Sequence, residues 1–138
     1  MRALSPVFVY ASNLDELPKA FAEALKQRAQ MMVVANDSFF GTYAKALVDL
    51  AALHRLPTVY SNDAYGALGG LAIYAYSSTT LQRNAAVFVD RILKGQKPAE
   101  IPFEQPTHFE LVVNLRTAKT LGLTIPPSVR IRADKLIE

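Results

Sequence analysis

Short apolar runs alternate with segments of helical periodicity through the first 95 residues of the chain. The apolar runs are rich in β-branched and aromatic residues and lack regular polar alternation, so they predict strands that are buried on both faces. Four such strands are expected, near residues 6–11, 31–36, 57–61 and 70–75. Between them, apolar residues spaced three and four apart predict amphipathic helices.

Capping residues mark the ends of these helices. Asn13 followed by Glu16 has the spacing of a capping box and predicts a helix that continues to about residue 28. Further helices are expected over 43–54, in a short stretch after Asn62 and Asp63, and over 79–93, where Gly95 ends the helix. The apolar stripe of the 79–93 helix consists of Leu81, Ala85, Phe88 and Ile92.

Strands that alternate with helices predict an α/β fold, in which helices cover both faces of a doubly wound parallel sheet. We expect residues 1–95 to form this Rossmann-like lobe. Residues 96–138 hold five of the eight prolines and are expected to complete the lobe. They predict a Pro-rich connector over 97–107, a strand over 109–113, a helix over 115–121 that Gly122 ends, and a last helical piece over about 128–137.

Composition and charge exclude several classes of function. The 15 Lys and Arg residues exceed the 12 acidic residues by only three, and they are scattered along the chain, so we expect no nucleic-acid binding. Without cysteine, the chain has no disulfide, thiolate nucleophile or Cys-ligated zinc. His54 and His108 lie in segments with no reason to meet, so we expect no metal site.

The sequence also lacks the common motifs of catalysis and cofactor binding. It contains no Walker loop, no G-x-S-x-G and no G-x-G-x-x-G. We therefore expect no catalytic residues, no cofactor and no enzymatic activity. No apolar run approaches the ~18 residues of a membrane span, and the start of the chain does not have the pattern of a signal peptide.

Candidate ligand-binding residues follow the ends of the predicted strands. In open parallel sheets, ligands bind beyond the carboxyl ends of the strands, where loops and helix N-termini converge. The side chains there are hydroxyls, amides, carboxylates and aromatic rings, which suit a small polar ligand with an apolar or planar part. The candidates are Asp37, Tyr74, Asn36, Asn62, Asp63, Tyr76 and Ser12.

Several of these positions have a purely structural interpretation as well. Ser38 and Asp63, like Asn13, are typical helix caps, and Asp37 has a cap's position too. Asp37 also precedes two phenylalanines, where a carboxylate beside apolar rings suits a ligand ammonium or hydroxyl. Tyr74 and Tyr76 face the same side of a strand, and core packing is the alternative interpretation of that pair.

The second half of the chain carries a long and specific motif. Residues 103–128 read FEQPTHFELVVNLRTAKTLGLTIPPS, which closely resembles the C-terminal signature of ABC-transporter substrate-binding proteins, a family that includes tryptophan/tyrosine transport receptors. Residues 89–100, VDRILKGQKPAE, and residues 55–60, RLPTVY, are similar to the same family. The stretch Gly69-Gly70-Leu71 fits it too, so the resemblance covers essentially the whole chain.

This resemblance implies a lobe of the type I periplasmic-binding-protein kind. Its function would be to hold a small ligand in a cleft between two lobes, as the solute-binding component of an ABC importer. A free aromatic or branched amino acid is the expected ligand class, and an ABC permease is the expected partner. The full-length protein would be periplasmic or lipid-anchored and extracytoplasmic. The alternative function is that of a small doubly wound enzyme or a ligand-sensing regulatory domain.

In this family the receptor is bilobal and longer than this chain, which implies that the chain is a C-terminal-lobe fragment. The family positions that match Asp37 and Tyr74 line the inter-lobe cleft, although Ala75 stands where the family has glycine. The family's helix that matches 79–93 crosses back towards the first lobe. Without that lobe its apolar stripe lacks part of its cover, so we expect a homodimer in which this helix or the tail packs on the other chain.

Overall fold

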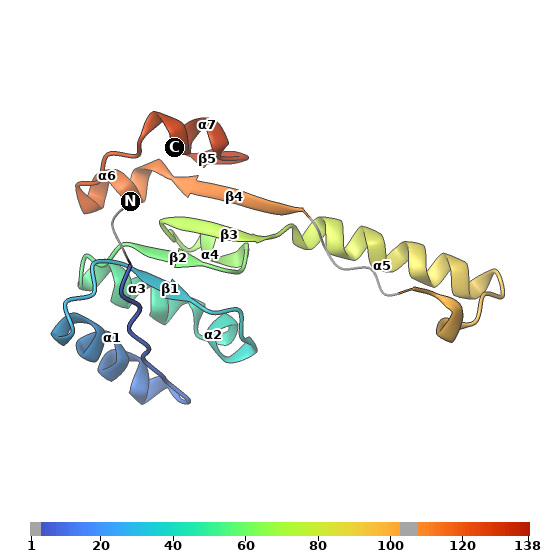
Figure 1. The fold of residues 1–138 in the computed structure, drawn as a ribbon, viewed down its shortest axis with the longest axis horizontal. Coiled ribbons are helices and arrows are strands. Elements are labelled where there is room, and N and C mark those ends of the chain that lie inside the picture. Colours follow the sequence, from blue (N-terminus) through green and yellow to red (C-terminus); the bar gives the residue numbers. More distant parts are fainter. Residues whose placement is uncertain (1–3, 103–107) are drawn as a thin grey trace.

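Five strands form one mixed sheet in the computed structural model, which describes residues 4–102 and 108–138. In the order of the sheet they are β1 (Met32–Val34), β2 (Thr58–Tyr60), β3 (Ala72–Tyr76), β4 (Phe109–Asn114) and β5 (Lys135–Ile137). The first three are parallel, β4 runs antiparallel to β3, and β5 is parallel to β4. The α/β fold class is therefore confirmed, with a sheet that is mostly parallel (Figure 1).

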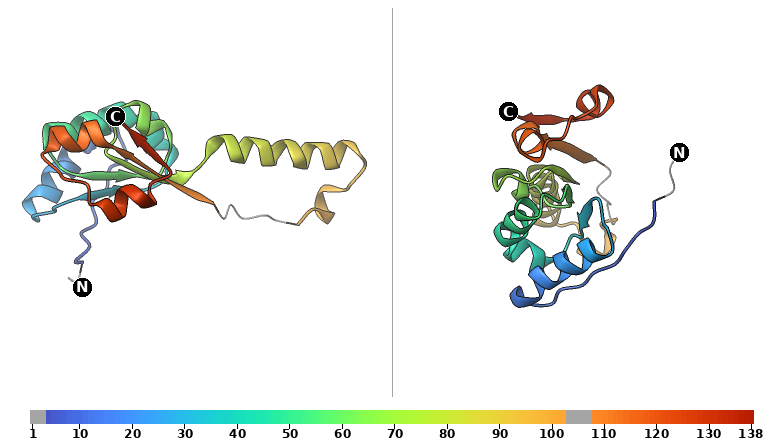
Figure 2. Two further views of the ribbon diagram at one scale, coloured as in Figure 1. Left: turned by 90° about the horizontal axis from the view of Figure 1, so that it is seen from above. Right: turned by 90° about the vertical axis from the view of Figure 1, so that its left-hand side faces the viewer.

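Most of the predicted helices are present. The helices are α1 (Leu17–Lys26), α2 (Ser38–Thr42), α3 (Ala44–Leu53), α4 (Ala64–Ala67), α5 (Ser78–Leu93), α6 (Leu115–Leu121) and α7 (Pro127–Arg132), with 3₁₀ turns η1 (Leu14–Glu16) and η2 (Pro98–Glu100). As Figure 2 shows, α3, α4 and α6 lie on one side of the sheet and α7 on the other. Gly95 and Gly122 follow α5 and α6 with φ of 96° and 74°, the left-handed conformation that glycine adopts without strain after a helix.

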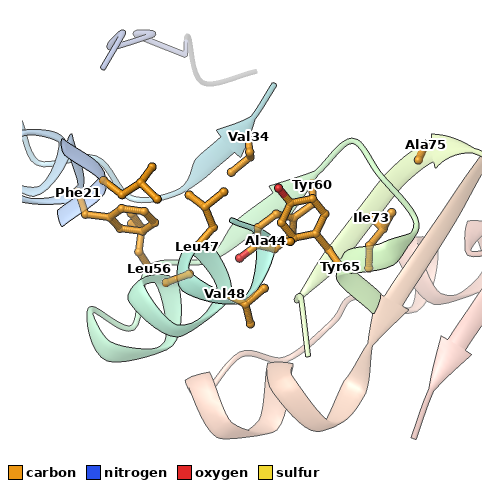
Figure 3. Packing of buried hydrophobic residues seen from close by; sticks show 12 residues of the cluster. Phe21, Val34, Ala44, Leu47, Val48, Leu56, Tyr60, Tyr65, Ile73 and Ala75 are labelled. Atoms are coloured by element: carbon orange, nitrogen blue, oxygen red, sulfur yellow. The ribbon is translucent and has the colours of Figure 1, made fainter. Parts of the chain in front are cut away.

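The core fills the space between the sheet and α3. Alternate strand residues point into it, so that Tyr60 and Ile73 are each only 1% exposed. Leu47 from α3 and Phe21 from α1 pack in the same cluster (Figure 3). This cluster fixes α3 and the carboxyl ends of β1 and β2 relative to one another, and those ends carry the candidate site residues.

The predicted strand over residues 6–11 is wrong. Residues 4–11 contain no strand, and Val7, Phe8 and Tyr10 are exposed. A strand needs a neighbour for its N–H and C=O groups, and the nearest strand in sequence, β1, pairs only with β2 among the described residues. An apolar β-branched run predicts burial, but it does not supply the pairing partner.

The predicted last helix, over 128–137, is wrong in its second half. Helix α7 ends at Arg132, and residues 135–137 form β5 instead. Asp134 causes the change: its backbone N–H donates to the Leu111 carbonyl at 2.9 Å, and its carboxylate accepts from the Leu111 N–H at 2.7 Å. These two bonds attach the chain to β4 and start the parallel pairing of β5.

Helix α5 and the residues that follow it leave the body of the protein. We call residues 78–102 the arm. It continues outward from the end of β3, and the chain then returns to begin β4 (Figures 1 and 2), which explains why β4 is antiparallel. None of the 16 residues of α5 is buried. The connector predicted over 97–107 contains η2, and its residues 103–107 lie outside the described residues.

Candidate functional site

The candidate site lies at one edge of the sheet, where the parallel strands β1, β2 and β3 all end. Asn36 and Asp37 follow β1, and Asn62 and Asp63 follow β2. The Ser61 hydroxyl donates to the Val34 carbonyl at 2.7 Å and joins the ends of β2 and β1. We call this edge, residues 36–37 and 61–63, the rim.

Asp37 is the N-cap of α2. Its Oδ1 accepts from the Phe39 N–H at 2.8 Å, and the residue is exposed. Among the described residues, nothing donates a hydrogen bond to its second oxygen. The cap and the ligand interpretations of Asp37 are therefore compatible, since one oxygen caps the helix and the other accepts no described hydrogen bond. The prediction that Ser38 is the cap is wrong, because α2 begins one residue after Asp37.

Asn62 and Asp63 have different roles. Asn62 Oδ1 accepts from the Ala64 N–H at 2.9 Å, at the start of α4. Asp63 was expected to cap that helix, but it makes no side-chain capping bond to it. Its Oδ2 instead accepts from the Ser78 N–H at 3.2 Å, in the first turn of α5. Asp63 therefore links the rim to the root of the arm, where helix N–H groups favour an anion.

Three aromatic rings pack together at the carboxyl end of β3, the strand next to β2 in the sheet. The Phe109 ring lies 5.0 Å from that of Tyr74, at an interplanar angle of 11°, and 4.1 Å from that of Tyr76, at 34°. Tyr74 is 51% exposed and Phe109 38%. We call these three residues the aromatic platform. Core packing does not account for Tyr74, since half of it faces solvent.

The sequence did not indicate Phe109 as a candidate site residue. The strand over 109–113 was predicted, but nothing in the sequence shows which strand pairs with it. The antiparallel register of β3 and β4 sets Phe109 opposite Tyr76. That register depends on the return of the chain from the arm, which a local pattern does not encode.

Ser12 has local contacts, away from the other candidates in sequence and in the sheet. Its N–H donates to Glu16 Oε2 at 2.7 Å, and Asn13 Oδ1 accepts from the Glu16 N–H at 3.1 Å. Asn13 is thus confirmed as the N-cap, of η1. The return bond of the predicted capping box differs, because the Glu16 carboxylate accepts from the Ser12 N–H and the Asn13 side-chain amide and not from the Asn13 backbone N–H. The bond from the Ser12 N–H and then that from the Asn13 amide hold the pKa of Glu16 below its ordinary value. No described contact joins Ser12 to the rim.

Two buried tyrosines support the rim from the core side. The rings of Tyr60 and Tyr65 stack at 4.3 Å, and the Tyr65 hydroxyl donates to the Phe40 carbonyl at 2.7 Å. Burial raises the pKa of both phenols, so both stay neutral at physiological pH. Their role is to hold α4 and α2 in place, because a neutral buried phenol offers no charge to a ligand.

No metal centre is found in the described part of the chain. A cavity of about 20 Å³ lies between α3, β2 and α6, away from the rim, and it has room for about one water molecule. Over residues 4–102 and 108–138, no three His, Asp or Glu side chains are grouped to hold a metal ion. No described helix is long and apolar enough to cross a membrane.

Comparison with known proteins identifies the family. The model of the family described as ABC transporter substrate binding protein matches residues 2–137. An ABC domain from Streptococcus pneumoniae, solved in complex with L-Trp, is 25% identical with a TM-score of 0.79, over 89% of this chain and 42% of that one. A conserved domain protein from Vibrio cholerae O1 biovar El Tor is 21% identical with a TM-score of 0.78, over 88% of this chain and 41% of that one.

A curated relative agrees with this assignment. An uncharacterized protein of Rickettsia prowazekii (strain Madrid E) is 25% identical over 105 residues, which are 76% of this chain and 34% of the relative. The chain thus spans about a third of that relative and about two-fifths of the solved chains. The matched family is one of substrate-binding proteins and not of enzymes. This chain belongs to the family of ABC transporter substrate-binding proteins.

Proposed function

We propose that this chain is one lobe of the solute receptor of an ABC importer, and that it binds an amino acid with an aromatic side chain at the rim. The observation that carries the proposal is the shared direction of three strands. Because β1, β2 and β3 are parallel, the exposed carboxylate of Asp37 and the aromatic platform both lie towards the carboxyl ends of these strands. The structure of the S. pneumoniae domain with L-Trp, at 25% identity, supports this ligand class.

Each end of an amino acid has a matching group in the proposed site. The second oxygen of Asp37 pairs with the ligand ammonium in a charge-assisted hydrogen bond. The amides of Asn36 and Asn62 are the donors for the ligand carboxylate. Tyr74 and Tyr76 stack on the ligand ring, since offset stacking of aromatic pairs adds about 0.5–1.5 kcal/mol to the burial of their surface.

The rest of the receptor is part of the same proposal. Because the chain spans two-fifths of the solved relatives, a second lobe would form the other wall of the cleft and close over the ligand. The ligand drives closure only through its higher affinity for the closed form. The family supports an extracytoplasmic location and an ABC permease as partner. This chain alone is expected to bind the ligand more weakly than a two-lobed protein.

The test is calorimetry with L-Trp, L-Tyr, L-Phe and L-Leu, on this chain and on a two-lobed protein that contains it. Ligand at 100 times Kd should stabilise the protein by about 2.7 kcal/mol in thermal unfolding. No binding of any aromatic amino acid to either protein would contradict the proposal, and so would turnover of the ligand.

Two substitutions separate the charge of Asp37 from its role as a cap. Asp37→Asn keeps the N-cap hydrogen bond but removes the partner of the ammonium, and losing one partner of a desolvated pair costs ~2–5 kcal/mol. We expect at least ~30-fold weaker binding at an unchanged melting temperature. Asp37→Ala should lose both binding and the cap. Asp49→Asn, at an exposed carboxylate paired with Lys45 in α3, is the matched control and should bind like the parent.

A further inference from the structure

Helices α2 and α3 follow each other directly, but a break at Tyr43 separates them. Helix α2 ends at Thr42 and α3 begins at Ala44, and Tyr43 has φ of −103° and ψ of 26°. In a continuous helix the Ala44 N–H would donate to the Phe40 carbonyl, four residues earlier. That bond is absent, and no other backbone N–H in the described part of the chain donates to this carbonyl. The break therefore leaves the Phe40 carbonyl without a backbone partner.

The Tyr65 side chain provides the partner that the helix lacks. Its hydroxyl donates to the Phe40 carbonyl at 2.7 Å, across 25 positions of the sequence. The residue is 2% exposed, its ring stacks on that of Tyr60 at 4.3 Å, and its own carbonyl accepts from the Gly70 N–H at 2.8 Å. Burial raises the pKa of the Tyr65 phenol, so the hydroxyl keeps the proton that it donates. The core thus fixes the direction of this hydroxyl.

The position of Asp37 depends on the same short helix. Helix α2 has only five residues, and a helix of this length is not stable without tertiary support. Asp37 is its N-cap and accepts from the Phe39 N–H. Without the Tyr65 hydroxyl, the helical period makes the Ala44 N–H the donor for the Phe40 carbonyl. That bond would join α2 to α3 as one helix, which changes the direction of α2 and with it the position of Asp37.

We propose that Tyr65 is a positioning residue of the ligand site, whose hydroxyl keeps the break between α2 and α3 and so holds the Asp37 carboxylate at the rim. Tyr65 is buried in one core cluster with Ala44 (Figure 3), and it acts through Asp37 and not by contact with the ligand. This inference rests on the proposed function, in which Asp37 pairs with the ligand ammonium. A protein that adopts its binding conformation for only a fraction of the time binds with an affinity reduced by that fraction.

Another side-chain hydroxyl makes a bond of the same kind and serves as the matched control. Thr117 Oγ1 donates to the Gly69 carbonyl at 2.9 Å and joins α6 to the turn before β3. It makes no described hydrogen bond to α2. Thr117→Val and Tyr65→Phe each leave one backbone carbonyl without its side-chain donor, so their effects on stability should be similar. The two substitutions differ in which part of the chain loses the bond.

The first test is calorimetry with L-Trp, on this chain and on a two-lobed protein that contains it. Tyr65→Phe keeps the stacked ring and should bind L-Trp ~10-fold more weakly than the parent, as expected for the loss of a buried hydrogen bond. Thr117→Val should bind like the parent. When Asp37 is already replaced by Asn, adding Tyr65→Phe should change the affinity by less than ~2-fold, because residues that act through one another are not additive.

Amide hydrogen exchange, followed by NMR in the same proteins without ligand, reports the break itself. In Tyr65→Phe the Ala44 amide should exchange at least ~5-fold more slowly than in the parent, because it gains the Phe40 carbonyl as acceptor. The amides of β2 and β3 should exchange alike in Tyr65→Phe and Thr117→Val. A general loss of packing has the opposite sign at Ala44, since local opening speeds exchange.

Weaker binding of L-Trp together with slower exchange at Ala44 supports the proposal. If Tyr65→Phe binds like the parent, the positioning role is overturned and the proposed function stands. Exchange at Ala44 that is unchanged or faster would also overturn it, and so would a loss of affinity that persists in full when Asp37 is replaced by Asn. A parent that binds no aromatic amino acid would overturn both the positioning role and the proposed function.

Discussion

The two sides of the sheet differ sharply although the same strands form both. On the side of α3 and α4, Tyr60 and Ile73 are almost completely buried, whereas one residue further along β3, Tyr74 is half exposed. Nevertheless, the side of the sheet that faces away from α3 is as apolar as the covered side, with Val33, Val59 and Ala72 where a solvent-facing strand would alternate to polar residues. The exposure of Val33 and Tyr74 therefore means that no described element covers them.

The arm shows the same relation between pattern and cover. Its stripe has the spacing of a core-facing helix, but α5 has no buried residue, whereas α3, of similar pattern, buries four: Ala44, Leu47, Val48 and Ala51. The difference comes from position and not from composition, since α3 lies over the sheet and α5 extends beyond it.

The largest expected effect comes from neighbouring residues on opposite faces of β3. Ile73→Ala opens a cavity in the core and should destabilise the protein by ~2–5 kcal/mol. Tyr74→Ala removes a half-exposed ring and should cost about 1 kcal/mol or less. Thermal and denaturant unfolding measure both variants. Equal losses would mean that the side facing away from α3 is as tightly packed as the covered side, and the two sides would not differ.

Alanine substitutions at two glycines, Gly70 and Gly41, are expected to change stability by less than Ile73→Ala does. A Cβ on Gly70 would lie 2.9 Å from the Tyr65 carbonyl oxygen and 3.0 Å from the Tyr60 ring, whereas a Cβ on Gly41 meets nothing within 4 Å. Gly70→Ala should destabilise the protein by ~1–3 kcal/mol through overpacking. Gly41→Ala, inside α2, should be neutral or stabilising by up to ~1 kcal/mol. A neutral Gly70→Ala would show that the core beneath the rim is loosely packed.

A smaller effect is expected where the arm begins, at the hydrogen bond from the Ser78 N–H to the Asp63 carboxylate. Asp63→Ala removes the acceptor for the Ser78 N–H, and loss of such a capping bond costs ~1 kcal/mol. We expect the amide of Ser78 to exchange about 5-fold faster with deuterium, with little change in the exchange of β2 and β3. Ser77→Ala, which removes the bond to the Thr80 N–H at 3.4 Å, is the comparison within the same turn. If Asp63→Ala instead loosens the whole sheet, Asp63 is a core support and not a link to the arm.

The smallest effect lies outside the sheet, at Glu16. Its folded-state pKa lies below the ordinary value of 4.5, through hydrogen bonds from Ser12 and Asn13. Its contribution to stability is therefore complete above that value and is lost as the pH falls through the folded-state pKa. Unfolding of the parent and of Glu16→Gln, followed from neutral to acidic pH, should show a slightly steeper acid decline for the parent. Identical pH profiles would mean that the capping box adds nothing to folding.

Local chemistry in the sequence was enough to predict much of this molecule. Asn13 with Glu16 predicts the first helix through its capping box, and glycines 95 and 122 end helices because they adopt positive φ without strain. The apolar runs of β1, β2 and β3 predict parallel strands, and the rule for such strands places Asp37 and Asn62 at one edge. These features depend on residues a few positions apart, so a single sequence contains their signals.

The tertiary structure alone decided how distant segments meet. Residues 6–11 have the composition of a strand but pair with no strand among residues 4–102 and 108–138. Residues 135–137 join the sheet because Asp134 bonds to Leu111, 23 residues earlier. Phe109 reaches the aromatic platform, and Asp63 the root of the arm, only through the return of the chain to β4 and the position of α5. The physical reason is that the spacing of apolar residues indicates which of them are buried in the fold. The segment that packs on them or pairs with them depends on the packing of the whole chain.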